Sequence, residues 1–233
     1  MTRLAVLTDL HYGTTPDPDQ SGEHALEFLN RAITLLNTRL QPDILLLGGD
    51  LIHDPDAPNA KTLCMELRKA LDQLHHPWLA VPGNHDLPPD SFYQVFERPA
   101  PAVDVNTLRI LPIVDPEAPG WNAERQDADL QAMISLTLDH TGPVAILQHM
   151  SLHPPDTQAA RFNLTNAETV IQTMHEANIH LSISGHYHPG FTLQKGPIHF
   201  IGCRALCEAP HPLTLINLAP NQPPRITEHS LNA

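Results

Sequence analysis

The sequence predicts an α/β fold of four layers, in which a sandwich of two β-sheets is flanked by helices. Before Phe191, short apolar segments typical of buried strands alternate with amphipathic segments of helical period. This alternation favours a mostly parallel sheet that is covered by helices. From Phe191 onward the pattern is that of consecutive β-strands without a long helix, so we expect a second, partly antiparallel sheet.

We interpret residues 1–233 as a single domain, because a chain of this length can bury a hydrophobic core. An apolar fraction of 41% argues against a disordered chain. No apolar run reaches the roughly 18 residues that a membrane span requires, and the first apolar run meets Asp9 before it could form a signal peptide. The 3 cysteines, without a secretion signal, indicate reduced thiols, so we predict a cytoplasmic protein with no membrane partner.

The hydrophobic periodicity assigns the elements, with apolar runs of four to seven residues taken as strands and longer runs of helical spacing taken as helices. Strands are predicted at Leu4–Leu7, Ile44–Leu47, Trp78–Val81, Leu108–Val114, Val144–Leu147, Leu181–Ser184, Phe191–Gln194, Ile198–Gly202, Leu213–Leu218 and Ile226–Ser230. Helices are predicted at Ala25–Leu36, Leu63–Leu74, Ala123–Leu138 and Ala167–Ala177. Ser21 is expected to be the N-cap of the first helix.

Five groups of polar residues each follow closely after a predicted strand. They are Asp9-x-His11, Gly49-Asp50, Gly83-Asn84-His85-Asp86, His149 and Gly185-His186-x-His188. Open α/β sheets bind their ligands at the carboxyl ends of parallel strands. Each group alone is also compatible with an ordinary turn or a surface histidine, but the five together predict one shared site.

The types of side chain in these groups indicate a catalytic metal site. The pairs Asp9-x-His11 and His186-x-His188 each place two donors on the same side of an extended backbone. Carboxylate, imidazole and amide donors suit Mn, Fe, Zn or Co better than Ca, which prefers oxygen ligands throughout. The 3 cysteines lack the paired spacing of a structural zinc site.

In type and order, the five groups resemble the signature of the calcineurin-like metallophosphoesterase superfamily, and the resemblance extends from Asp9 to His188. It implies a β-sandwich flanked by helices, in agreement with the periodicity. It also implies hydrolysis of phosphate esters with two transition-metal ions (Mn, Fe or Zn), by in-line attack of a hydroxide that bridges them. The resemblance assigns one ion to Asp9, His11, Asp50 and His188, and the other to Asp50, Asn84, His149 and His186.

The resemblance also suggests roles for residues that hold no metal. His85 would donate a proton to the leaving oxygen or stabilise charge on the phosphoryl group. The block Gly49–His53 resembles the DNA-repair nuclease branch, in which a histidine at the place of His53 supports the catalytic one; an exposed loop histidine is the alternative. Asp86 is expected either to orient a ligand or to cap a turn. Arg204 is a candidate for binding a substrate phosphate, with a surface ion pair as the alternative.

The charge balance bears on the class of substrate. A formal net charge of −13, with only 13 Lys and Arg, argues against a nucleic-acid partner. Bound divalent ions could still attract a small phosphorylated substrate. We therefore expect a phosphodiesterase acting on small diesters such as cyclic nucleotides, or a phosphomonoesterase. The alternatives are a DNA or RNA nuclease of the same superfamily and a non-catalytic metal-binding module, and the sequence assigns no oligomeric state.

Overall fold

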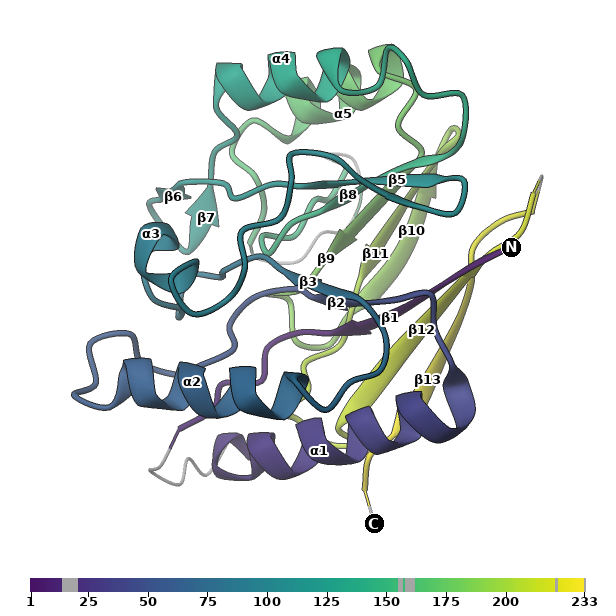
Figure 1. Cartoon of the computed structure of the whole chain (residues 1–233). Helices are drawn as coiled ribbons and strands as arrows, with labels where there is room; N and C mark the ends of the chain where they lie inside the picture. The colour runs from purple at the N-terminus through teal and green to yellow at the C-terminus, as the bar shows by residue number, and fades with distance from the viewer. Residues whose placement is uncertain (14–20, 155–156, 158–161, 221, 233) are drawn as a thin grey trace.

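The computed structural model describes residues 1–13, 21–154, 157, 162–220 and 222–232. Two β-sheets pack face to face, and a pair of helices covers the outer face of each sheet (Figure 1). The predicted α/β sandwich with flanking helices is therefore confirmed.

The first sheet contains β1 (Thr2–Leu7), β2 (Ile44–Leu47), β3 (Trp78–Ala80), β12 (Pro212–Leu218) and β13 (Arg225–Ser230). Their order in the sheet is β13-β12-β1-β2-β3. The strands β1, β2 and β3 are parallel, whereas β12 runs antiparallel to both β1 and β13. The carboxyl ends of the three parallel strands therefore meet at one edge.

The second sheet contains β4 (Val103–Val105), β5 (Leu108–Pro112), β8 (Val144–Leu147), β9 (Leu181–Ser184), β10 (Phe191–Lys195) and β11 (Ile198–Gly202). Their order is β10-β11-β9-β8-β5-β4. The four central strands are parallel, and the edge strands β4 and β10 are antiparallel to their neighbours. A separate hairpin, β6 (Glu117–Ala118) and β7 (Asn122–Ala123), follows β5.

Four helices form the outer layers. The first sheet is covered by α1 (Ala25–Leu35), which continues into a π-helical turn at Leu36–Leu40, and by α2 (Ala60–Leu71). The second sheet is covered by α4 (Asp127–Ser135) and α5 (Ala167–Glu176). Two short helical turns, Gly22–His24 and α3 (Pro89–Phe92), lie in connections. Within the described residues, no helix is long and apolar enough to cross a membrane.

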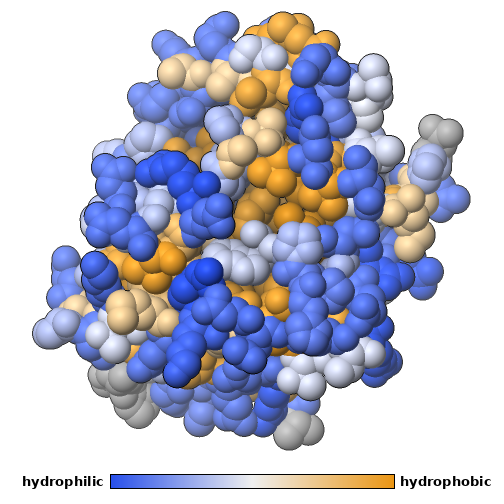
Figure 2. Space-filling model, viewed as in Figure 1, coloured by the Kyte–Doolittle hydropathy of each residue, from blue (hydrophilic) through white to orange (hydrophobic). Residues whose placement is uncertain are grey.

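The central strands are buried on both faces, because each lies between the other sheet and a helical layer. In β1, Leu4 and Val6 contact the core between the sheets, whereas Ala5 and Leu7 contact the core under α1 and α2. Burial on both faces explains the continuous apolar runs of the sequence, which lack the alternation of a half-exposed strand. Figure 2 shows hydrophilic side chains over most of the visible face and hydrophobic ones in the hollow between the two helical layers.

The structure corrects several predicted boundaries: the helix predicted at Leu63–Leu74 is Ala60–Leu71, and the strand predicted at Leu108–Val114 ends at Pro112. The helix predicted at Ala123–Leu138 begins only at Asp127, because Ala123 belongs to β7 and forms a β-bridge with Leu164. Ser21 is not the N-cap of the first long helix, which begins at Ala25 after a 3₁₀ turn; within the described residues the Ser21 side chain makes no capping hydrogen bond. At Ala123 the apolar period thus extends beyond the residues that adopt helical geometry.

The predicted composition of the second sheet was also wrong. The last four strands do not form a sheet of their own: β10 and β11 join the second sheet beside β9, and β12 and β13 return to the first sheet beside β1. Local periodicity identifies a strand but not its partner, because pairing depends on packing between residues far apart in sequence.

We expect Leu46→Ala to lower the free energy of unfolding by about 2–5 kcal/mol, the range for leucines truncated in a packed core. Leu46 is fully buried in β2, where it faces the core between the two sheets. Urea denaturation measures the change. Leu138→Ala is the matched control, because Leu138 is 81% exposed and should change stability by no more than about 0.5 kcal/mol. Equal effects of the two substitutions would contradict the packing described here.

Candidate metal centre

The five polar groups lie together where parallel strands from both sheets end. Asp9 follows β1, Asp50 follows β2, Asn84 follows β3, His149 follows β8 and His186 follows β9. The distances given below show that all seven residues predicted to hold metal lie in one site, formed between the edges of the two sheets. The loops that carry these residues thus lie together because the strands that precede them end at neighbouring sheet edges.

Four of these residues have left-handed backbone conformations, with φ of 52° at Asp9, 47° at His11, 51° at Asp50 and 66° at His186. Residues other than glycine rarely adopt this region, at a cost of about 1–3 kcal/mol each, and such strain concentrates at functional sites. The loops also approach each other closely. A side chain at Gly83 would collide with the Asp50 carboxylate, which explains the glycine at that position.

The first cluster consists of Asp9, His11, Asp50 and His188. The Nε2 atom of His188 lies 3.3 Å from Nε2 of His11 and 3.5 Å from Oδ1 of Asp9. Nε2 of His11 lies 3.6 Å from Oδ2 of Asp50. On the other side of its ring, His188 donates from Nδ1 to the Glu208 carboxylate at 2.6 Å. This hydrogen bond leaves the Nε2 lone pair of a neutral His188 facing the cluster.

The second cluster consists of Asp50, Asn84, His149 and His186. The Nε2 atom of His149 lies 3.1 Å from Oδ1 of Asn84, 3.2 Å from Nδ1 of His186 and 3.2 Å from Oδ2 of Asp50. The same Oδ2 atom of Asp50 therefore faces both clusters. A carboxylate in this position can serve two cations at once.

Backbone carbonyls orient both imidazoles of the second cluster. His149 donates from Nδ1 to the Gly48 carbonyl at 2.8 Å, and His186 donates from Nε2 to the Trp121 carbonyl at 3.1 Å. In the neutral imidazoles these bonds leave lone pairs on Nε2 of His149 and Nδ1 of His186, which face each other. Facing lone pairs repel unless a cation lies between them, so the donor types and their orientation fit a metal ion.

Buried carboxylates attract positive charge to both clusters. Burial by itself lowers the pKa of His149, but the negative charge of Asp50 outweighs burial and raises this pKa to about 10. The contact with Asp9 likewise outweighs burial at His188 and raises its pKa to about 9. Although burial opposes it, these imidazoles hold the pKa values of Asp9 and Asp50 below their usual range. A metal ion binds the same atoms by displacing protons.

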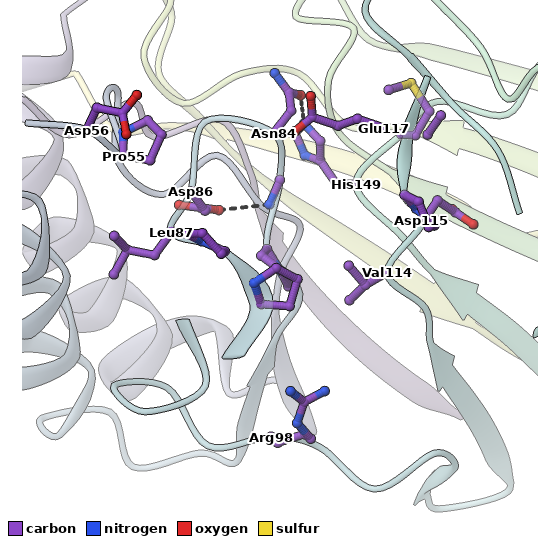
Figure 3. A pocket seen from close by; sticks show the side chains of 17 residues that line it. Pro55, Asp56, Asn84, Asp86, Leu87, Arg98, Val114, Asp115, Glu117 and His149 are labelled. Carbon is purple, nitrogen blue, oxygen red and sulfur yellow. Dashed lines mark hydrogen bonds between the residues drawn. The ribbon is translucent and has the colours of Figure 1, made fainter. Parts of the chain in front are cut away.

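Asp86 joins the two loops that carry Asp50 and Asn84. Its Oδ1 accepts the backbone N–H groups of Leu51 at 2.8 Å and Ile52 at 3.1 Å. Its Oδ2 accepts the N–H of Gly83 at 2.9 Å (Figure 3). Burial, and then the charge of Asp50, raise the pKa of Asp86 to about 7. Asp86 thus orients two loops of the site and does more than cap its own turn.

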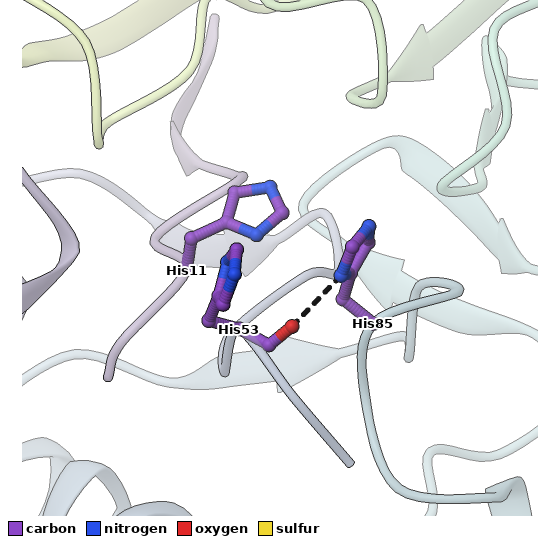
Figure 4. A group of neighbouring side chains, drawn as sticks. All are labelled: His11, His53 and His85. Atoms are coloured by element: carbon purple, nitrogen blue, oxygen red, sulfur yellow. Dashed lines mark hydrogen bonds between the residues drawn. The ribbon is translucent and has the colours of Figure 1, made fainter. Parts of the chain in front are cut away.

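His85 lies at the side of the clusters and is held from two directions. Its backbone N–H donates to Oδ1 of Asp50 at 2.8 Å, and its Nδ1 donates to the carbonyl of His53 at 2.8 Å (Figure 4). The imidazole rings of His53 and His85 are inclined by 26° to each other, and their centroids lie 5.7 Å apart. His53 therefore contacts His85 through its backbone carbonyl. Its side chain is exposed, as in the alternative of an exposed loop histidine, so a supporting role for this side chain stays a prediction.

A cavity of about 230 Å³ opens over both clusters. Its lining consists of candidate ligands, His85 and the aromatic residues Trp121 and Phe162. A second cavity of about 630 Å³ shares Asn84 with the first and extends past His149 (Figure 3). A small molecule could therefore reach the clusters and still extend beyond them.

Arg204 does not join the site. Its Nη1 lies 3.3 Å from Oε2 of Glu228, and its Nη2 donates to the Ala209 carbonyl at 3.3 Å. It lines a different cavity, next to Gly190. The structure thus shows the surface ion pair that the sequence left as the alternative.

Sequence reasoning missed four residues beside the clusters: Trp121, Phe162, Cys207 and Glu208. The Cys207 thiol is buried, and its Sγ lies within 4.8 Å of ligand atoms of His11 and His188. Cys207 and Glu208 follow the predicted strand Ile198–Gly202, and a position after a strand could have pointed to the site. They belong to no recognisable motif, however. Trp121 lies in a segment predicted to lead directly into a helix, and nothing local placed it near the site.

Comparison with known proteins gives one consistent result. A family model of calcineurin-like phosphoesterases matches residues 2–190. A protein of Synechococcus sp. named a probable cyclic nucleotide phosphodiesterase is 25% identical over 213 residues, covering 87% of this chain and 79% of that protein. A protein of the same name from Pseudoalteromonas sp. is 38% identical over 84 residues, or 36% of this chain and 31% of that protein. The crystal structure of a dimetal phosphatase from Danio rerio has the same fold, with a TM-score of 0.80 at 15% identity, covering 99% of this chain and 96% of that one.

We expect Glu208→Ala to weaken Mn²⁺ binding about 10- to 100-fold, the usual effect of removing a partner that orients a ligand. The carboxylate of Glu208 holds the ring of His188 through a 2.6 Å contact. Titration calorimetry of chelator-treated protein measures the affinity, and Glu208→Gln should retain most of it because an amide oxygen still accepts the hydrogen bond. Glu228→Ala, which removes a carboxylate paired with Arg204, serves as the control. An unchanged affinity in Glu208→Ala would exclude this orienting role.

Proposed function

Because the chain belongs to the calcineurin-like phosphoesterase family, and is therefore a phosphoester hydrolase, we propose that it cleaves small phosphodiesters at a centre of two metal ions. The observation that carries this proposal is the pair of donor clusters that share Asp50. Ligand atoms of Asp9, His11 and Asp50 lie within 4.8 Å of one another, and so do those of Asp50, His149 and His186. Mn, Fe and Zn all suit such mixed donors.

In this proposal each side chain has a defined task. One ion would be held by Asp9, His11, Asp50 and His188, and the other by Asp50, Asn84, His149 and His186. When bound, two such ions make a water molecule acidic and neutralise the phosphate oxygens in an in-line displacement. The chain itself holds the donors in place, through the carbonyls behind His149 and His186, the Glu208 carboxylate and the Asp86 clamp.

His85 is the proposed proton donor to the leaving oxygen. Its Nδ1–H is engaged by the His53 carbonyl, so the opposite ring nitrogen, Nε2, is the atom available to the substrate. An imidazolium has a donor on each nitrogen and can keep the first bond while it transfers a proton from the second. The backbone bond from His85 to Asp50 holds the ring beside the clusters, so the reacting groups need little rearrangement.

The size and charge of the site favour a small diester over a polymer. The cavity over the clusters has a volume of about 230 Å³, and its described lining residues include no lysine or arginine. A chain with a net charge of −13 lacks the basic surface that a nucleic-acid backbone requires. Two relatives, from Synechococcus sp. and Pseudoalteromonas sp., are named probable cyclic nucleotide phosphodiesterases. A phosphomonoester is the closest second substrate class.

A panel of phosphate esters tests this proposal. We expect Mn²⁺-loaded protein to hydrolyse bis(p-nitrophenyl) phosphate faster than p-nitrophenyl phosphate, and a chelator to abolish the activity until Mn²⁺ is restored. Absorbance of released p-nitrophenolate measures both rates. Faster hydrolysis of p-nitrophenyl phosphate would indicate a phosphomonoesterase. If neither ester is hydrolysed in the presence of Mn²⁺, Fe²⁺ or Zn²⁺, the proposal is refuted. Cleavage of linear DNA at 150 mM salt would instead indicate a nuclease.

We expect His85→Ala to lower kcat on bis(p-nitrophenyl) phosphate about 100- to 10,000-fold, as for loss of a general acid. Its Mn²⁺ content should remain that of the unchanged protein, because His85 is assigned no metal. Elemental analysis and steady-state kinetics separate these two effects. His24→Ala is the control, because the His24 side chain is 57% exposed, faces Glu23 and Glu27 and does not line the cavity. Unchanged turnover in His85→Ala would exclude the proton transfer.

A further inference from the structure

The hairpin of β6 and β7 brings an aromatic side chain to the candidate metal centre. Its connecting residues 119–121 end at Trp121, and Asn122 donates from Nδ2 to the Pro119 carbonyl at 2.9 Å, which closes the turn. Trp121 lines the cavity over the two donor clusters. A hairpin that follows β5 thus lines a site whose candidate ligands come from strand ends.

Two contacts fix Trp121 relative to the reacting groups. Its backbone carbonyl accepts the Nε2–H of His186 at 3.1 Å, so its position is tied to a proposed metal ligand. Its indole lies parallel to the imidazole of His85, with 6° between the planes and 6.2 Å between the ring centroids. The indole is therefore held in a defined orientation beside the proposed proton donor.

Packing of the core does not account for this side chain. Trp121 is 61% exposed, and it is one of four large apolar residues with exposed side chains among the described residues. Its φ of 61° lies in the left-handed region, where a bulky residue is strained. An exposed indole on a strained backbone at the edge of an active-site cavity is typical of ligand binding rather than of stability.

Phe162 extends the aromatic part of the cavity. Its ring meets that of His186 edge to face, with centroids 5.2 Å apart. The segment after it is joined to the hairpin, because Leu164 forms an isolated β-bridge with Ala123 and the N–H of Asn163 donates to the side-chain oxygen of Asn122 at 3.0 Å. The contacts between the hairpin and the segment after Phe162 thus connect the backbone that carries Trp121 with the backbone that carries Phe162.

The cavity therefore has a lining of two chemical kinds, the polar candidate metal ligands and the aromatic residues Trp121 and Phe162. We propose that Trp121 is a specificity-determining residue that stacks on the base of a nucleotide substrate while the phosphodiester lies at the metal ions. This inference rests on the proposed function and narrows its substrate class to nucleotides. Stacking on an aromatic side chain tolerates any base, because every base has a π-face.

Removing the indole should reduce the preference for a substrate that carries a base. The probes are cyclic AMP and the same cyclic phosphate without its base, each assayed with Mn²⁺-loaded protein. We expect Trp121→Ala to lower the ratio of their kcat/KM values about 10- to 100-fold, mainly through the KM of cyclic AMP, as expected for the loss of one stacked base. Trp121→Phe should restore most of the ratio. Leu138→Ala removes another exposed apolar side chain and should leave the ratio unchanged.

Outcomes of this experiment separate the inference from the function on which it rests. Both variants keep the backbone carbonyl that His186 contacts, so an unchanged Mn²⁺ content shows that the metal site is intact. Hydrolysis of bis(p-nitrophenyl) phosphate with an unaltered ratio in Trp121→Ala would overturn the inference and leave the proposed function standing. Failure to hydrolyse any of the three compounds, the two cyclic phosphates and bis(p-nitrophenyl) phosphate, would overturn the proposed function.

A binding measurement tests the stacking without turnover. The chain has 2 tryptophans, so in Trp78→Phe protein all indole fluorescence comes from Trp121. We expect AMP, added to the Mn²⁺-loaded protein, to quench this fluorescence in a saturable manner, whereas ribose phosphate should not. Quenching by both compounds equally, or by neither, would overturn the proposal that Trp121 contacts the base.

Discussion

The position of the Asp50 carboxylate is the constraint on which the rest of the site depends. Its Oδ1 accepts the backbone N–H of His85 at 2.8 Å, and its Oδ2 lies 3.2 Å from Nε2 of His149 and 3.6 Å from Nε2 of His11. A buried carboxylate is costly unless donors or cations compensate its charge. Loops from both sheets supply that compensation, and this brings the two candidate metal clusters and His85 to one place.

The scaffold stabilises the strained loops around this carboxylate. Hydrogen bonds from Asp9 N to Gly49 O and from His11 N to Asp50 O, both 2.9 Å, continue the pairing of β1 with β2 past the ends of the strands. Asp86 adds three backbone hydrogen bonds between the next two loops. The left-handed conformations of the ligands persist because these surroundings leave no alternative. The hydrogen bonds at the sheet edges and those of the buried Asp86 therefore hold the candidate ligands in position.

Chemistry and recognition come from different parts of the chain. The strand ends carry the donors that would hold metal, whereas Trp121 comes from a hairpin inserted between β5 and α4. The contact from His186 to the Trp121 carbonyl joins the two parts. A hairpin of this kind can vary without disturbing the strands, which is a physical reason why one shared site can serve different substrates in a family.

The sequence by itself determined the fold class, most strands and the seven residues that converge, because apolar period and strand-end position are local signals. Only the tertiary structure decided that β12 and β13 return to the first sheet, that His53 contacts His85 through its carbonyl, that Arg204 pairs with Glu228, and that Glu208 and Trp121 adjoin the site. Each of these depends on contacts between residues far apart in sequence. Such contacts are set by the packing of whole elements, and no short motif encodes them.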